Sequence, residues 1–321
     1  MTPPLLLSTD LSEESQLEAG QPTQTRALRD RLPHAVNAVV RTSAFYRRSL
    51  VQSPVVKPWS DAHYEARLAR HAGSVPDLST EQQQVLAEMR SSAAVRHIDM
   101  PAEVRASADR FADILSRKQN NEPCIKATPA ELSTDPTLFT WGLAPHLLDL
   151  AEAHVGLPVR YLGMEVKREQ VVDPEISRLH DAVRCWHLDH EDRRIVKVIV
   201  YLSDVHSGAA PFGYVEQSNT ERVRGLIRHH QDIVSDDRMQ TVVPRDDWHQ
   251  VTGPRMTAVY VDTGQVFHRV FPATSAERYS VTFAYSSKNP YFTYKNLMLP
   301  RPVLRQLRSE LTARQWDALP R

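Results

Sequence analysis

The segment Arg278-Tyr-Ser-Val-Thr-Phe-Ala-Tyr285 decides the fold class, because its residues alternate strictly between two kinds. The odd-numbered positions hold aromatic or apolar residues and the even-numbered positions hold polar or small ones, which is typical of a β-strand with two different faces. We expect the aromatic face to pack under helices and the polar face, which carries Arg278 and Ser280, to point into a barrel. A guanidinium on that face can form a bidentate pair with a carboxylate, and a hydroxyl two residues further on can add a hydrogen bond.

Three other runs share this two-residue period, at residues 159–168, 195–202 and 257–262. Short strands that follow one another without helices at βαβ spacing favour an antiparallel barrel or sandwich. In the run 195–202 one face is entirely apolar, whereas the other carries Lys197 and Tyr201. We expect the apolar face to lie under the helices and Lys197 and Tyr201 to reach into the barrel. The alternative for Lys197 is a position in solvent.

The chain before residue 159 is mostly helical in its apolar spacing. Ser79 followed by Gln82 predicts a capping box at the start of a helix, and residues 102–118 and 145–155 have helical periodicity. We therefore expect an α+β protein. Its expected parts are a polar N-terminal tail at 1–30, a helical region at 31–158, a β-rich core at 159–290 with a helical insertion near 219–234, and a C-terminal segment at 291–321 with one closing helix over 303–319.

Composition excludes several classes of protein. The 321 residues are 41% hydrophobic and 24% charged, which excludes a disordered or fibrous chain. Lys+Arg and Asp+Glu both count 39, so no net field attracts nucleic acid or an anionic membrane. The 10 glycines form neither a dinucleotide-binding fingerprint nor a P-loop. Two cysteines, Cys124 and Cys185, suit a reducing compartment, and no apolar stretch has the length of a membrane span, so we expect a soluble cytoplasmic protein.

Histidines gather in the β-rich part of the chain, where eight of the 14 lie between residues 180 and 268. The sharpest local pattern is Cys185-Trp-His-Leu-Asp-His190, in which His187 and Asp189 are two residues apart. On an extended segment these side chains project from one face. They offer an imidazole and a carboxylate, which are two adjacent corners of a metal site. The alternative is a hydrogen-bonded pair at a strand end.

A third element, Val261-Asp-Thr-Gly-Gln-Val-Phe-His268-Arg, runs from a strand through a glycine turn to a histidine. Closure of a barrel can bring such distant strand ends together. The rival of His268 is His249, which has no following strand and no suitably placed arginine. For Arg278 the alternative to a carboxylate anchor is a surface ion pair with Glu277 or another acid.

Together these features resemble the core of the iron(II)- and 2-oxoglutarate-dependent dioxygenases, and among them the phytanoyl-CoA dioxygenase-like family. The resemblance covers residues 159–288. It rests on Trp186-His-Leu-Asp189, the Leu202-Ser-Asp-Val205 strand end, Pro211-Phe-Gly-Tyr-Val215, residues 261–269 and Arg278. The chain departs from the family at Val215-Glu-Gln-Ser-Asn219, where a Pro-Gly-Ser-His-like turn is usual. The resemblance implies a double-stranded β-helix, a jelly-roll or cupin-like core, with N-terminal helical support and a C-terminal helix.

The resemblance also implies an activity. The iron ligands would be a 2-His-1-carboxylate triad of His187, Asp189 and His268, which leaves positions open for 2-oxoglutarate and O2. Arg278 would anchor the distal carboxylate of 2-oxoglutarate with help from Ser280, and Lys197 and Tyr201 would lie near the same co-substrate. The expected reaction is hydroxylation of a small-molecule substrate (an amino acid, acyl group or secondary-metabolite intermediate), with release of succinate and CO2.

We expect substrate to be recognised by the segments 171–184 and 211–248, which lead into and out of the strands that hold the metal. These segments are rich in arginine, and this favours an anionic substrate group. The candidate substrate contacts are Arg184, Trp186, Arg222 and Arg228. The alternatives are a solvated helix face for the arginines and simple packing for Trp186.

Two further readings stay open. A cupin-like metal-binding isomerase or binding protein would use the same ligands without 2-oxoglutarate, and such a protein has no use for a buried Arg278. An inactive scaffold would not need the intact ligands. We expect a small-molecule partner and neither nucleic acid nor membrane, and both a monomer and a homodimer are compatible with the sequence.

Overall fold

The computed structural model describes residues 50–51, 53–173, 184–226, 233–291, 293 and 297–320. All of them belong to one unit, Arg47–Arg321. The tail expected at 1–30 and the beginning of the region 31–158 lie outside the described residues. Among the helices that are described, none combines the length and the apolar character needed to cross a membrane.

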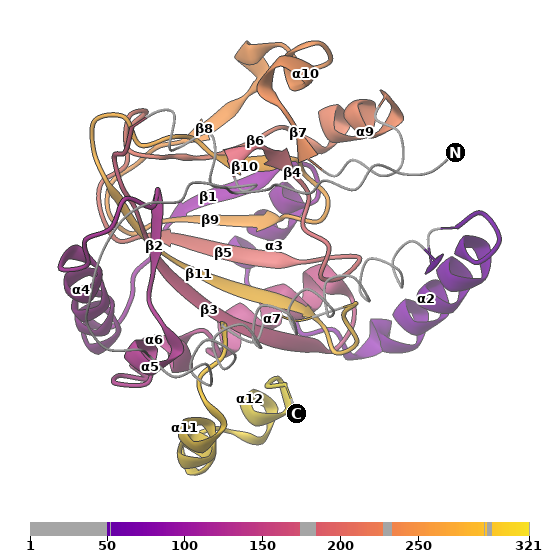
Figure 1. Ribbon diagram of the computed structural model, residues 1–321. Helices are drawn as coiled ribbons and strands as arrows, with labels where there is room; N and C mark the ends of the chain where they lie inside the picture. The colour runs from indigo at the N-terminus through magenta and orange to yellow at the C-terminus, as the bar shows by residue number, and fades with distance from the viewer. Residues whose placement is uncertain are drawn as a thin grey trace, which may run out of the picture. The chain divides into compact units, whose positions relative to one another are not determined.

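Two antiparallel sheets form the centre of the unit (Figure 1). The major sheet has the strand order β1 (Ala93–His97), β9 (Thr257–Asp262), β5 (Val196–Tyr201), β11 (Arg278–Ser287), β3 (Val159–Glu169) and β2 (Cys124–Lys126). The minor sheet has the order β7 (Ile233–Val234), β4 (Trp186–His187), β10 (His268–Val270), β6 (Phe212–Tyr214) and β8 (His249–Val251). The expected mixture of helices and antiparallel strands is confirmed.

Helices cover the outer face of the major sheet. They are chiefly α3 (Thr80–Met89), α4 (Ala102–Ser116), α6 (Thr137–Trp141) and α7 (Pro145–Val155), and in Figure 1 α3 and α7 are seen behind the strands. The capping box of Ser79 and Gln82 is confirmed at the start of α3. Gly156 adopts a left-handed conformation, with φ 72°, and ends α7.

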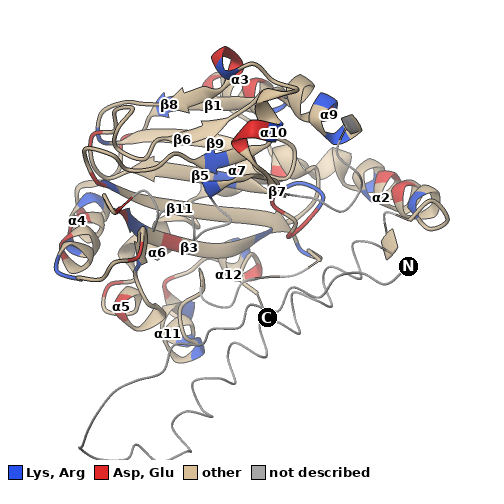
Figure 2. Ribbon diagram, turned by 45° about the horizontal axis from the view of Figure 1, so that its top comes forward, with Lys and Arg blue, Asp and Glu red and all other residues tan. Residues whose placement is uncertain are grey.

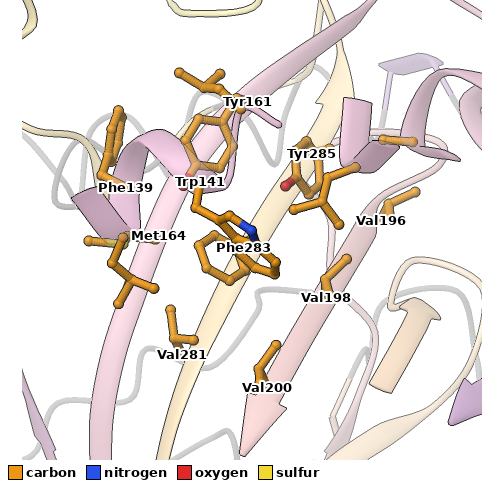
Figure 3. Packing of buried hydrophobic residues seen from close by; sticks show 14 of the residues in the cluster. Phe139, Trp141, Tyr161, Met164, Val196, Val198, Val200, Val281, Phe283 and Tyr285 are labelled. Carbon is orange, nitrogen blue, oxygen red and sulfur yellow. The ribbon is translucent and has the colours of Figure 1, made fainter. Parts of the chain in front are cut away.

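The aromatic face of β11 packs under these helices, as its alternation predicted. Phe283 is fully buried and its ring centroid lies 5.2 Å from that of Trp141 on α6. The apolar face of β5 joins the same cluster (Figure 3). The inner faces of the two sheets meet in a second cluster, where Ile199 and Tyr201 of β5 pack with Phe212 of β6. The space that contains the candidate site therefore lies between the sheets.

Three features differ from the sequence-based expectation. The region expected to be helical contributes β1 and β2, which are short edge strands of five and three residues. The expected closing helix is divided into α11 (Arg301–Gln306), a 3-10 turn (Leu307–Ser309) and α12 (Ala313–Asp317), because Thr312 is extended, with ψ 163°, and its side chain caps α12. The insertion near 219–234 contains α9 (Gln217–Leu226) and β7, with residues 227–232 outside the described range.

The other described helices are the 15-residue α2 (Lys57–His71) and the shorter η1 (Ala72–Ser74), α5 (Pro129–Leu132), α10 (Asp236–Gln240) and η3 (Arg245–Asp247).

Candidate metal centre

Two strands of the minor sheet bring the candidate ligands together. Strands β4 and β10 pair antiparallel, with His187 directly opposite His268, and their ring centroids are 4.2 Å apart. Asp189 follows His187 by two residues. One possible ligand atom from each of these three residues lies within 4.8 Å of the other two. Among the described residues, these three form the group of three or more His, Cys, Asp or Glu side chains that lie close enough together to hold one metal ion.

The turn between β9 and β10 positions both segments. The Asp189 N–H donates to the Thr263 carbonyl over 2.9 Å. Asp262 Oδ1 accepts from the N–H groups of Gly264, at 3.0 Å, and Ile195, at 3.1 Å. Because the same turn leads on to His268, it ties the H-x-D segment to the distal histidine. His154 of α7 contacts the other oxygen of Asp262 at 2.7 Å and so connects the helix layer to this turn.

Hydrogen bonds determine which nitrogen of each imidazole faces the cluster. His187 Nδ1 lies 2.9 Å from the Cys185 carbonyl, and His268 Nδ1 lies 3.1 Å from the Val266 carbonyl. A carbonyl can only accept, so each Nδ1 carries the proton and each Nε2 keeps its lone pair. The Nε2 atoms of His187 and His268 lie 4.0 and 3.6 Å from the carboxylate oxygens of Asp189. This is the arrangement in which metal-binding histidines are usually held.

The electrostatics favour the protonation states that bind metal. Burial, and next the proximity of His187, lowers the pKa of His268 to about 3. Burial also lowers the pKa of His187. For Asp189, burial alone would raise the pKa, but neighbouring groups, Lys197 first among them, hold it well below its usual range. Two neutral imidazoles and one carboxylate therefore face one another, and these are the forms in which metals are bound.

Lys197 reaches the inner face of β5, as the alternation predicted, and meets a candidate ligand there. Its Nζ lies 2.5 Å from Asp189 Oδ2. The position of Lys197 near 2-oxoglutarate stays a prediction, and the contact that the structure shows is with the carboxylate of the cluster. Tyr201, four residues further along on the same face, has its hydroxyl bonded to the backbone. It donates to the Val251 carbonyl at 2.8 Å and accepts from the Phe212 N–H at 3.1 Å.

Arg278 is buried on the inner face of β11, with 1% of its surface exposed, and this excludes the alternative of a surface ion pair. Glu277 instead accepts a hydrogen bond from Tyr279. Arg278 Nη1 donates to the Ala210 carbonyl at 2.5 Å, and its guanidinium lies over the ring of Tyr201. Arg278 Nε and Ser280 Oγ are two of several buried side-chain atoms that have no hydrogen-bond partner among the described residues, and they share one face of β11. Two neighbouring donors on one strand face are thus available for a carboxylate.

A buried carboxylate near Arg278 was missed by the sequence reasoning. Glu169 of β3 is paired with Arg278 in the strand register, and its Oε1 lies 3.7 Å from Arg278 Nη2. Its other oxygen accepts from Arg184 at 2.8 Å. Lys167 Nζ lies 3.5 Å from Glu169 and 3.7 Å from Glu165. The available signal was the alternation of charged residues at 165, 167 and 169, on the face of the strand opposite Val166 and Arg168. Figure 2 shows charged positions of both signs on the strands of the major sheet.

The four candidate substrate residues have different surroundings. Arg184 is buried, and besides Glu169 it donates to the carbonyls of Pro123 and Phe271. Trp186 is fully buried on the outer side of the minor sheet, with its ring centroid 5.1 Å from that of Trp248. Arg222 is exposed on α9 and donates to Asn219. Arg228 lies outside the described residues.

The rival ligand His249 lies on β8, two strands away from His268 in the minor sheet. Its ring stacks on Tyr214, with the centroids 4.7 Å apart, and 43% of its side chain is exposed. It does not belong to the described metal-ligand group.

Comparison with known proteins gives matches among solved structures only. No protein-family model matches the chain. No curated protein matches it either.

Three solved structures illustrate the similarity. HygX from Streptomyces hygroscopicus, with nickel and 2-oxoglutarate bound, is 15% identical, has a TM-score of 0.45, and matches over 66% of this chain and 88% of its own. SnoN, a non-heme alpha ketoglutarate dependent epimerase from nogalamycin biosynthesis, is 15% identical with a TM-score of 0.47, over 69% and 88%. EctD from S. alaskensis, with bound Fe, is 15% identical with a TM-score of 0.47, over 70% and 82%. Because these values are low, we base the function on the chain's own residues.

Proposed function

We propose that the chain is an Fe(II)- and 2-oxoglutarate-dependent oxygenase of the phytanoyl-CoA dioxygenase-like kind that hydroxylates a small molecule. The observation that carries the proposal is the pairing of two features between the sheets. One is the cluster of His187, Asp189 and His268, and the other is the buried donor pair of Arg278 and Ser280. A 2-His-1-carboxylate set with open positions is typical of non-haem Fe(II) oxygenases.

The residues present fit both groups. His187 and His268 would bind Fe(II) through Nε2, and Asp189 would bind it through a carboxylate oxygen. Arg278 Nε and Ser280 Oγ would hold the distal carboxylate of 2-oxoglutarate, because both donors are buried and neither has a partner among the described residues. When bound, Fe(II) with 2-oxoglutarate and O2 supplies the oxidising chemistry that releases succinate and CO2. The apolar cluster of Ile199, Tyr201 and Phe212 would keep water from the space between the sheets.

We also propose the organisation that accompanies this activity. Residues 159–290 would form a catalytic core of double-stranded β-helix type, supported by the region 31–158 and the segment 291–321. The substrate would be recognised by the segments before β4 and after β6. Exposed arginines such as Arg222 would contact an anionic group of that substrate.

The first experiment measures iron. Purified protein should bind one Fe(II) per chain under anaerobic conditions, and His187→Ala or His268→Ala should weaken binding strongly because each leaves two protein ligands. His249→Ala is the matched control, since it removes a nearby exposed imidazole outside the cluster. Loss of iron in His249→Ala, with iron retained in His268→Ala, would refute the assigned triad.

The second experiment separates the oxygenase from a cupin-like metalloprotein that does not use 2-oxoglutarate. Arg278→Ala should weaken 2-oxoglutarate binding by roughly 10- to 150-fold, since a charge-assisted pair contributes about 1.5–3 kcal/mol. Its iron content should be unchanged. The measurement is an anaerobic titration of the iron-loaded protein with 2-oxoglutarate, followed by absorption. Equal affinities in wild type and variant would favour the cupin-like reading.

A further inference from the structure

Lys197 makes a contact that the proposed chemistry does not require. Its Nζ lies 2.5 Å from Asp189 Oδ2, and the two side chains are only 20% and 12% exposed. In the major sheet, Lys197 is flanked by Val261 of β9 and Ala284 of β11, which have no polar side-chain atoms. The ammonium group of Lys197 therefore lies between the sheets, beside an apolar section of the inner face, and contacts the carboxylate of Asp189 there.

The oxygen that Lys197 contacts also faces the metal cluster. Asp189 Oδ2 lies 3.6 Å from His268 Nε2, whereas Oδ1 lies 4.0 Å from His187 Nε2. The ammonium group thus shares the carboxylate with any cation bound by the three ligands. The set of Asp189 and two neutral histidines carries one negative charge, and the ammonium group of Lys197 places one positive charge beside it.

We propose that Lys197 is a positioning residue that holds one oxygen of Asp189 and sets the charge of the metal centre. Because like charges repel, its ammonium group weakens binding of a divalent cation. Because opposite charges attract, the same ammonium group strengthens binding of a dianionic co-ligand such as 2-oxoglutarate to the metal-loaded site. This inference rests on the proposed function and adds a trade-off to it: metal affinity is given up so that the anionic co-substrate is held more tightly.

The test compares wild type with Lys197→Met, which keeps the length of the side chain and removes its charge. Two affinities are measured by calorimetry, for Co2+ by the metal-free protein and for 2-oxoglutarate by the Co2+-loaded protein. In the variant we expect Co2+ to bind roughly tenfold or more tightly and 2-oxoglutarate to bind roughly tenfold or more weakly. The visible spectrum of bound Co2+ should change as well, because Asp189 becomes free to bind through both oxygens.

Control variants separate charge from structure. Lys197→Arg keeps the charge and should keep both affinities near those of wild type. Lys118→Met removes a lysine from an ion pair of similar exposure, with Glu131 at 2.6 Å, that includes no residue of the cluster, and should change neither affinity. If Lys197→Met does not fold, Lys197→Gln retains an N–H donor for Asp189 without the charge and should show the same opposite shifts.

The outcomes distinguish the inference from the proposed function. If both affinities fall together in Lys197→Met and Lys197→Gln, the lysine has only a structural role and the inference is wrong. It is equally wrong if neither affinity changes while wild type binds Co2+ and His268→Ala does not. If wild type itself fails to bind Co2+ or Fe(II), the proposed function fails first.

Discussion

The two faces of the major sheet use the same strands for opposite purposes. On the outer face, Val198 of β5 and Phe283 of β11 are buried with the helices in one apolar cluster (Figure 3). On the inner face, the same two strands carry Lys197 and Arg278, and β3 adds Glu169. Alternate residues of one strand thus serve packing on one side and charge placement on the other.

The difference shows where stability and function are placed. Apolar burial on the outer face contributes free energy of folding without any requirement for partners. On the inner face, each buried charge is stable only beside its counter-charge, as Glu169 is beside Arg184 and Arg278. Substitutions on the outer face should therefore change the free energy of unfolding alone, whereas those on the inner face should also change ligand binding.

The largest expected effect belongs to the outer face. Phe283→Ala should reduce the free energy of unfolding by roughly 3–5 kcal/mol, because it leaves a cavity beside Trp141 and Tyr161. Denaturant unfolding measures this loss. Under conditions where the variant is folded, its Fe(II) content and 2-oxoglutarate affinity should match wild type. A large change in either one would show that the two faces are not independent.

A smaller effect with two readouts is expected for Arg184→Met, which removes a partner of Glu169 on the inner face. Losing the bond to Glu169 should reduce the free energy of unfolding by roughly 1.5–3 kcal/mol. Glu169 is then held by fewer cations and should pair more closely with Arg278, so 2-oxoglutarate binding should weaken several-fold. Calorimetry with 2-oxoglutarate and denaturant unfolding give the two values.

The matched control is Arg168→Met, on the opposite face of β3. Arg168 is also buried and donates to the backbone carbonyls of Leu115 and Ser116. The Arg168→Met variant should lose a similar free energy of unfolding and keep the 2-oxoglutarate affinity of wild type. If Arg168→Met weakens binding of 2-oxoglutarate as much as Arg184→Met does, the proposed division between the faces is wrong.

The contrast between the faces also explains what the sequence could predict. The face assignments of β5 and β11 follow from a two-residue period, which is a local property of a strand, and they are confirmed. The short edge strands β1 and β2 were missed, because five and three residues give too little periodicity to recognise. The partners of Glu169 and Lys197 were missed for other reasons. Arg278 lies far from Glu169 in the sequence, and only the sheet register pairs them. Asp189 lies eight residues from Lys197, but the irregular turn between them has no periodicity that predicts the contact.

The smallest expected effect is the contribution of His268 to the pH dependence of the free energy of unfolding. In the folded protein His268 has a pKa of about 3, whereas an unfolded histidine titrates near 6.5, so between these values only the unfolded state binds the proton. The free energy of unfolding should therefore fall as pH drops through this window. From pH 7 to pH 5 the contribution of His268 is at most about 2 kcal/mol, because one pKa unit corresponds to about 1.4 kcal/mol.

Glu191 acts in the opposite direction over the same range, since burial raises its pKa to about 7 and the folded state holds its proton where the unfolded state does not. Wild type alone would mix these two contributions. The comparison with His268→Gln isolates the histidine, because Glu191 is present in both proteins. Unfolding of metal-free protein, with a chelator present, should show a smaller loss of stability from pH 7 to pH 5 in His268→Gln than in wild type. Parallel curves would mean that His268 titrates alike in the folded and unfolded chains and is not held neutral by burial between the sheets.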